Sequence, residues 1–265
     1  MPASPALTIV RHPGLPGLEA VVGRGVAADI AAHAHGAVVV GLCLAGGRRI
    51  VWGGGETRIE AGQGFVVPAG VRHACAPLGG AGQEYLVLAV RPEALCAAGV
   101  APGEPDVRVR TWQDDPAKTL VLRAAAALAG DPGLALATLA ALAGRLGLRP
   151  GKSTTLHPAT LRARAAIDAD PAAGHCLTAL ARLAGVGPTY LERVFGRDTG
   201  MSVGQYLLGR RVRLAAARIA GGEGLADAAL AAGFYDQSHL TRHFRRRMGV
   251  PPGRYRETDA VPGVP

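Results

Sequence analysis

The chain is poor in aromatic residues and has no long apolar run. Phe, Trp and Tyr make up only 4% of its 265 residues, so leucine, valine and alanine must fill the cores of the two domains that this length allows. No apolar run reaches the roughly 20 residues of a membrane-spanning helix. The opening MPASPALT lacks the charged segment and apolar stretch of a signal peptide. We therefore expect a soluble protein with no membrane partner.

Cysteine is scarce and scattered. Cys43, Cys75, Cys96 and Cys176 lie far apart and form no Cys-x-x-Cys pair. This spacing argues against a disulfide framework and favours a reducing compartment, so the expected location is the cytoplasm. Cys96 and Cys176 are expected to be small core residues.

Lysine is absent from the last hundred residues, but positive charge is not. From residue 157 onward the chain has 15 Arg and 9 Asp or Glu, which gives +6, whereas residues 1–156 have 14 basic and 11 acidic residues, which gives +3. The C-terminal part therefore carries most of the net charge of +9, in the compact form expected of a surface that faces phosphates. Solvated helix faces are the alternative explanation.

Two kinds of secondary structure are predicted before residue 150. Short β-branched or aromatic runs separated by glycines extend from about residue 18 to 90, as in a β-sandwich or small barrel. Asp115-Pro116 then marks a helix start, and the Ala/Leu-rich segments 120–128 and 134–146 predict a helical pair. These helices have little polar surface, which leaves open whether they pack against the barrel or pair two protomers.

The last hundred residues contain one pattern twice, 49 residues apart. LERVF at 191–195 is followed after four residues by a segment from Gly to Tyr at 200–206, and LTRHF at 240–244 is followed after the same gap by 249–255. Two copies are too few for a solenoid, so we infer a duplicated helical module.

Each copy has the layout of a helix-turn-helix. Helices are predicted at 177–184 and 188–198 in the first copy, and at 225–232 and 237–248 in the second. Gly185 stands where the chain needs a positive φ to leave the first helix. Further helices are predicted at 159–168, at 203–220 as the connector and, briefly, at 252–257. A rigid connector would let the two second helices enter major grooves about 34 Å apart.

The second copy carries Ala-x-x-x-Gly-Phe at 229–234, Ser-x-Leu-x-Arg-x-Phe at 238–244 and Gly-x-x-Pro-x-x-Tyr-Arg at 249–256. With these motifs, residues 159–256 resemble the DNA-binding domain of the AraC/XylS family of transcription regulators. The connector residues Tyr206, Arg211 and Ala215 match the family as well. One departure is Gly187, where the family usually has Ser, so the first reading helix is expected to be less well capped.

The resemblance implies a regulator that binds double-stranded DNA, and RNA polymerase if it activates transcription. Short polar side chains followed by Arg suit the reading of base edges, and outer Arg side chains suit phosphates. The residues implied to contact DNA are Thr189, Glu192, Arg193 and Arg197 in the first module, Arg211 in the connector, and Gln237, Ser238, Thr241, Arg242 and Arg246 in the second. For each, a phosphate contact or a solvated side chain is the alternative to base reading.

The N-terminal half resembles a cupin, a small β-barrel that AraC-type regulators often carry as an effector and dimerisation domain. Residues 62–73 (GQGFVVPAGVRH) match the second cupin motif, and His33-Ala-His35 matches the start of the first. The first motif's usual Glu is absent, because residues 37–41 contain no carboxylate, and Pro77 stands where the second motif ends in Asn.

Three uses of this barrel remain open. His33, His35 and His73 would supply three imidazoles to a transition metal and leave one position open, as Zn, Ni, Co or Fe sites do. Cys75 shares the face of His73 if that segment is a strand. The alternatives are a small organic effector bound without metal, and a homodimer scaffold with structural histidines.

The expected fold class is α+β. A cupin-like barrel with a helical hairpin (1–148) is followed by a linker (149–156), an all-α domain of two helix-turn-helix modules joined by a long helix (157–258) and a tail (259–265). The expected function is an effector-responsive, DNA-binding transcription regulator and not an enzyme. The rival is a metal-dependent cupin oxygenase or isomerase with a helical appendage. It requires an open metal site and an acid–base group, and the missing Glu weakens both.

Overall fold

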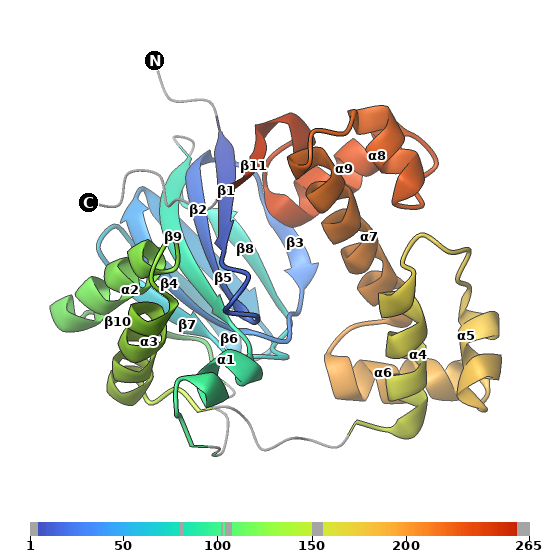
Figure 1. Ribbon diagram of the computed structural model, residues 1–265, viewed down its shortest axis with the longest axis horizontal. Coiled ribbons are helices and arrows are strands. Elements are labelled where there is room, and N and C mark those ends of the chain that lie inside the picture. The colour runs from blue at the N-terminus through green and yellow to red at the C-terminus, as the bar shows by residue number, and fades with distance from the viewer. Residues whose placement is uncertain (1–4, 80–81, 102, 104–107, 150–155, 259–265) are drawn as a thin grey trace. The chain divides into compact units, whose positions relative to one another are not determined.

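A computed structural model describes residues 5–79, 82–101, 103, 108–149 and 156–258 (Figure 1). The chain forms two compact units, one from residues 1–153 together with 254–265 and the other from residues 154–253. The expected linker falls mostly on residues 150–155 and the expected tail on 259–265, which lie outside the described residues. No helix in the described part is long and apolar enough to cross a bilayer.

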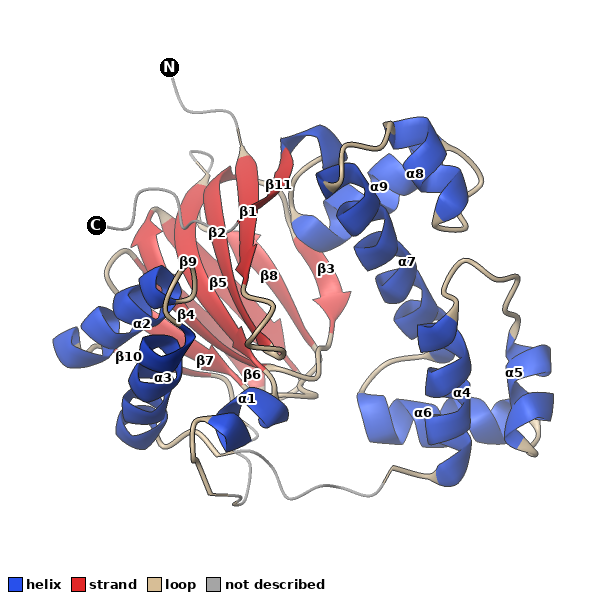
Figure 2. Ribbon diagram, in the orientation of Figure 1, coloured by secondary structure: helices blue, strands red, loops and turns tan. Residues whose placement is uncertain are grey.

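The first unit is built on two sheets, drawn red in Figure 2. The larger has the order β10-β7-β4-β9-β2-β1-β11, and the smaller has the order β3-β8-β5-β6. The strands of the larger sheet are β1 (Ala6–Arg11), β2 (Leu18–Val26), β4 (Val38–Ala45), β7 (Gly64–Val67), β9 (Gln83–Val90), β10 (Arg110–Trp112) and β11 (Tyr255–Thr258). Those of the smaller are β3 (Ile30–His33), β5 (Gly47–Trp52), β6 (Gly55–Glu60) and β8 (His73–Pro77).

Helices cover the outer face of the larger sheet. Alternate strand residues such as Val40, Leu86 and Leu88 are fully buried in one core with the helices α1 (Pro92–Ala97), α2 (Asp115–Ala127) and α3 (Pro132–Leu146). Of the two uses left open for the helical pair, the structure shows the packing on the barrel. The strands' other face carries side chains such as Phe65 and Tyr85, which meet residues of the smaller sheet. Successive side chains of a strand point to opposite faces of the sheet, so the strands of the larger sheet bury side chains on both faces.

Local caps set the helix starts. Asp114 accepts a hydrogen bond from the backbone N–H of Ala117 at 3.1 Å, and Asp131 accepts one from Leu134 at 2.9 Å. Each cap is followed by a proline in the first turn of its helix, where the missing N–H has no intrahelical partner to lose.

The second unit is all helical, with α4 (Pro158–Ala169), α5 (Leu177–Ala184), α6 (Pro188–Thr199), α7 (Val203–Ala220), α8 (Leu225–Ala231) and α9 (Gln237–Met248). The predicted helices 177–184, 203–220 and 237–248 are confirmed to the residue. The first module's core contains Ile167, Leu180, Leu191 and Phe195. Tyr206 of α7 packs its ring on Phe195 at a centroid distance of 5.5 Å and donates a hydrogen bond to Asp168 of α4 at 2.9 Å, which ties the connector to this core.

The chain end departs from the prediction. The brief helix expected at 252–257 is wrong: residues 252–254 form a 3-10 turn, and β11 then pairs in parallel with β1, with Leu7 opposite Tyr255. Tyr255 is buried and the segment belongs to the first unit. A strand forms here because its backbone partners are supplied by an edge about 250 residues away in sequence, which no local pattern reveals.

The cysteines are all free thiols, in keeping with the absence of a disulfide framework. Cys43 and Cys75 are buried. Cys96 and Cys176 are exposed, so the expectation that they fill cores is wrong. Cys176 instead occupies the N-cap of α5, where its sulfur accepts the backbone N–H of Ala179 at 3.4 Å.

Candidate functional site

The first helix-turn-helix consists of α5, a tight turn and α6. Gly185 has φ +71°, the left-handed conformation predicted for it, and the N–H of Val186 closes the turn on the carbonyl of Ala181 at 3.0 Å. Leu191 and Phe195 are fully buried on the inner face of α6. Gly187 is the N-cap and offers no side chain to the first turn, as expected from the departure at this position.

The predicted contact residues of α6 differ in exposure and in ion pairing. Thr189 and Arg193 are exposed, and the Arg193 guanidinium lies 5.1 Å from the centre of the Tyr190 ring. Arg197 is exposed but forms an ion pair with Asp198, with Nη2 and Oδ1 2.8 Å apart. Glu192 is partly buried. Of the contact residues predicted on α6, Thr189 and Arg193 are therefore the two that are exposed and not held in the ion pair with Asp198.

The second module repeats this design with a stronger cap. Gly233 has φ +79°, and a Cβ there would lie 2.9 Å from the carbonyl oxygen of Ala172, so only glycine fits the turn. Asp236 accepts the backbone N–H of His239 at 2.7 Å and starts α9. Leu240 and Phe244 are fully buried, which fixes the face that α9 turns outward.

The outward face of α9 is polar and cationic. The exposed residues are Gln237, Ser238, Arg242, Arg245 and Arg246. Thr241 is partly buried, and Arg247 turns inward against Gly209, where burial and the nearby Arg213 lower the pKa of its guanidinium. Four of the five predicted contact residues of this module, Gln237, Ser238, Arg242 and Arg246, thus share one open face.

Arg211 does not join this face. Its Nε donates to the carbonyl of Pro171 at 2.9 Å and its Nη2 donates to the carbonyl of Ala173 at 2.9 Å. These hydrogen bonds hold the α4–α5 loop onto the connector, so Arg211 has a structural role besides the DNA contact predicted for it.

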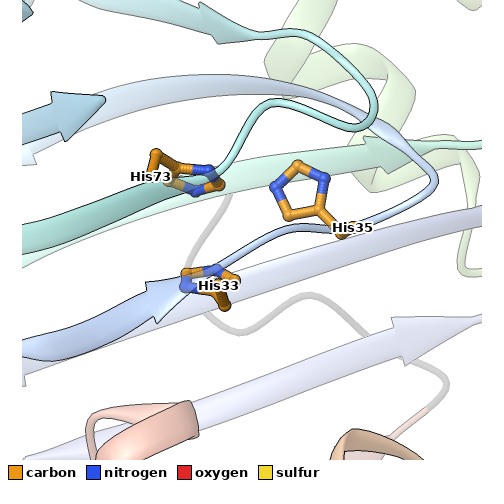
Figure 3. A group of neighbouring side chains, drawn as sticks. All are labelled: His33, His35 and His73. Carbon is orange, nitrogen blue, oxygen red and sulfur yellow. The ribbon is translucent and has the colours of Figure 1, made fainter. Parts of the chain in front are cut away.

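Three histidines gather in the first unit (Figure 3). His33 ends β3, His73 begins β8, and the two stand opposite each other in the register of the smaller sheet. His35 follows β3 and completes the group, with ring centroids 4.5 Å (His33 to His73), 5.0 Å (His35 to His73) and 5.8 Å (His33 to His35) apart. The candidate ligand atoms all lie within 4.8 Å of one another.

Hydrogen bonds orient all three rings in the same way. The Nδ1 atoms of His33, His35 and His73 lie 2.8, 2.7 and 2.9 Å from the carbonyl oxygens of residues 31, 37 and 71. A carbonyl only accepts, so each Nδ1 carries a proton, and in the neutral ring the lone pair is on Nε2. Metal-binding histidines are held by this kind of bond. Burial lowers the pKa of His73, which favours its neutral, ligating form.

These residues fit a transition metal with nitrogen ligands. Cys75, the fourth candidate, faces the same way along β8 and is buried. Among the described residues, however, the metal-holding group contains only the three histidines. Burial also raises the pKa of the Cys75 thiol, which disfavours the thiolate that a metal binds. We therefore leave Cys75 out of the candidate site.

Comparison with known proteins identifies the family. The AraC-like ligand binding domain matches residues 15–143 and a helix-turn-helix domain matches residues 180–258, together well over half of the chain. The protein belongs to the AraC family of transcription regulators. MarA of Escherichia coli is 36% identical over 76 residues, which are 28% of this chain and 60% of MarA. VirF of Yersinia enterocolitica is 35% identical over 86 residues, 32% of each chain.

A solved structure shares the fold over nearly the whole chain. The crystal structure of ToxT from Vibrio cholerae superimposes with a TM-score of 0.61 at 10% identity and covers 89% of this chain and 95% of that one. This likeness confirms the expected α+β fold, with a sheet-rich N-terminal region and a helical C-terminal region. MarA and VirF match 28% and 32% of this chain, and the matched part spans less than two thirds of either relative.

Proposed function

We propose that this AraC-family protein is a sequence-specific transcription regulator that reads DNA through α6 and α9. The main support is that α6 and α9 each bury one pair of apolar side chains and expose polar and arginine side chains on the opposite face. Gln, Ser, Thr and Arg at the start of such helices suit base edges, and the outer arginines suit phosphates. The base-reading residues we propose are Thr189, Arg193, Gln237, Ser238 and Arg242.

The proposed effector site is the histidine group of the barrel. A transition metal held there by His33, His35 and His73 would supply a crosslink between the end of β3 and the start of β8. The neighbouring carbonyls keep the three rings aimed at one point by hydrogen bonding to Nδ1. To control DNA binding, the bound form must favour one of two states of the protein, since an effector with equal affinity for both shifts nothing.

Further partners follow from the same proposal. VirF is by its name a transcriptional activator, and an activator of this design would contact RNA polymerase. A homodimer contact through the helical pair is part of the proposal, and the 40% exposure of Leu134 of α3 supports it. DNA as the partner supports a cytoplasmic location.

The test is a binding selection from genomic DNA fragments, run with metal analysis of the same full-length preparation. We expect a site about two helical turns long with two separate blocks of base preference. Stoichiometric metal would make the histidine group the sensor. Absence of enrichment from metal-loaded protein would contradict the proposal and favour the alternative of a metal-dependent cupin enzyme, which turnover assays would then address.

A further inference from the structure

One of the two proposed base-reading arginines rests on an aromatic ring. The Arg193 guanidinium lies 5.1 Å from the centre of the ring of Tyr190, which stands one turn earlier on α6. A cation at this distance from a tyrosine face is attracted to it. Within the described part of the chain, the same guanidinium makes no hydrogen bond or ion pair. The ring therefore holds Arg193 while its N–H donors remain open to a base.

The second module gives its arginine no such support. The 49-residue offset of the repeat places His239 at the position of Tyr190, three residues before Arg242. His239 is partly buried, and its ring packs on those of Phe234 and His243 at centroid distances of 5.4 and 4.7 Å. Among the residues that the structure describes, no aromatic ring takes up the Arg242 guanidinium. The two modules thus present their arginines differently.

The Tyr190 ring is itself held from outside α6. His157, the N-cap of α4, meets it edge to face with ring centroids 5.5 Å apart, a favoured aromatic geometry. The His157 Nδ1 accepts the backbone N–H of Ala159 at 3.1 Å, so in the neutral imidazole the proton is on Nε2. That Nε2 lies 3.3 Å from the Tyr190 hydroxyl oxygen and donates to it. A ring contact and a hydrogen bond therefore hold the same tyrosine.

His157 is also anchored at the far end of the reading helix. Its backbone N–H donates to Oδ2 of Asp198 at 2.8 Å, and the Asp198 side chain is only 6% exposed. Tyr190 stands in the first turn of α6 and Asp198 in its last, so His157 contacts both ends of this helix. Because Gly187 gives the start of α6 no side-chain cap, the contact from His157 supports a first turn that lacks one.

We propose that Tyr190 and His157 are positioning residues for Arg193, which they hold in order in the DNA-free protein. A free arginine loses side-chain freedom when it pairs with a base edge, and ordering it in advance reduces that loss. The first module therefore reads its base pair with a pre-ordered arginine, and the second module with a free one. The role assigned to the two residues rests on the proposed function of α6 and deepens it, because it says which side chains set the specificity of that helix.

The experiment measures the affinity of the full-length protein for the selected DNA site and for single-base variants in each of its two blocks. Tyr190→Leu should lower the discrimination in one block by roughly 3–10-fold, because only the matched base gains from a pre-ordered arginine. The other block is the internal control and should be unchanged. Tyr190→Phe keeps the ring and should retain most of the discrimination. Tyr235→Leu, which changes an 85% exposed tyrosine beside the start of α9, should leave the first block as in the wild type.

A double-mutant cycle separates positioning from a direct contact of Tyr190 with DNA. If the tyrosine acts through Arg193, Tyr190→Leu should have no further effect on discrimination in an Arg193→Met background. An equal loss in both backgrounds would overturn the positioning role.

His157→Asn tests the outer member of the chain of contacts. Asparagine keeps an N-cap acceptor for α4 but has no ring to meet Tyr190. We expect discrimination in the same block to fall roughly twofold or more, the scale of one lost aromatic contact, with an unchanged urea midpoint. Wild-type discrimination in this variant would overturn the role of His157.

A measurement without DNA tests the ordered arginine itself. In the NMR spectrum of the full-length protein, the side-chain protons of Arg193 should show upfield ring-current shifts, and those of Arg242 should not. The shifts should vanish in Tyr190→Leu and remain in Tyr190→Phe. Their absence from the wild type would overturn the proposal even if the protein binds DNA. Their presence in a protein that enriches no DNA would leave the ordered arginine standing and count against the regulator.

Discussion

Arginines in this protein have three different roles, and burial together with hydrogen-bond partners distinguishes them. Arg242 is exposed on the open face of α9. The Arg211 guanidinium donates hydrogen bonds to two backbone carbonyls. Arg48 is buried with one donor unsatisfied. The sequence shows only the residue type and not its partners. The predicted DNA contacts therefore included Arg211, and no role was predicted for Arg48.

Arg242→Ala should weaken binding to the selected DNA site by about 1–3 kcal/mol and relax the preference at one base pair. The reason is the loss of an exposed side chain that we propose to read a base edge. Electrophoretic mobility shifts on the site and its single-base variants measure this. Arg211→Ala is the matched control: it should lower the free energy of unfolding and leave the base preference unchanged. A binding profile of Arg242→Ala identical to the wild type would rule out the assignment.

His73→Ala should remove metal binding and the effector response but spare basal DNA binding. The buried ring is the member of the group on β8 and lies closest to the other two, so its loss leaves two imidazoles on one short segment. Metal stoichiometry by mass spectrometry and DNA binding with and without zinc or nickel are the measurements. His12→Ala, outside the group, is the control. A variant that still binds one metal and responds to it would take His73 out of the site.

At the scale of single elements, caps and small residues decide how well each module holds together. Ser202 starts α7 with a capping box, in which its hydroxyl accepts the backbone N–H of Gln205 and the Gln205 side chain accepts the N–H of Ser202. Asp236 caps α9. Gly187 gives α6 no such bond, so the first reading helix begins with the weakest cap of the three.

Gly187→Ser should therefore stabilise the helical unit by roughly 0.3 kcal/mol, since Ser caps only slightly better than Gly. The position has an extended backbone and no atom within 4 Å of an added Cβ, so the change introduces no strain. Ser202→Ala should act in the opposite direction and cost about 1 kcal/mol. Urea unfolding followed by circular dichroism measures both. A stabilisation by Gly187→Ser as large as the loss caused by Ser202→Ala would contradict the capping argument.

Ala229→Glu should destabilise the second module by more than about 3 kcal/mol, because a carboxylate would be buried without a partner. Ala229 of α8 is fully buried, where the module's two helices meet. Ala226→Glu, an exposed position of the same helix, is the control and should be nearly neutral. Cooperative unfolding of Ala229→Glu at the wild-type urea concentration would contradict the helix-turn-helix placement.

Helices were predictable from the sequence to a degree that strands were not. The boundaries of α5, α7 and α9 follow from signals inside or next to the helix, such as Gly185 and Asp236. β1, β10 and β11 were not predicted, because a short strand forms only where a distant segment provides hydrogen-bond partners. The candidate metal group could be predicted from its motif. The buried hydrogen bond from Arg48 of β5 to Gln83 of β9 could not, because it depends on the register of two sheets.

At the scale of the whole molecule, the chain enters the helical unit once and then returns to the first unit. Strand β11 covers the outer edge of β1 through pairs such as Leu7 with Tyr255. An uncovered edge strand exposes backbone donors and acceptors and invites pairing with other chains. The first unit is therefore complete only with residues that follow the DNA-binding helices.

Removing residues 254–265 should destabilise the first unit by roughly 3 kcal/mol, the scale of losing one large buried aromatic side chain, here Tyr255. It should also promote association through the bared β1. Removing only residues 259–265, which leaves β11 in place, is the control. Thermal unfolding and light scattering measure the two effects. A truncated protein that melts like the control and stays unassociated would show that β11 adds nothing to the sheet.

The pairing of β1 with β11 also sets an order of events on the ribosome. β1 is translated before the helical unit, and β11 is made only after that entire unit. Domains generally fold as units during synthesis, the N-terminal one first, but here the first sheet must wait for its last strand. The nascent chain thus carries an open sheet edge while the DNA-binding helices emerge and fold.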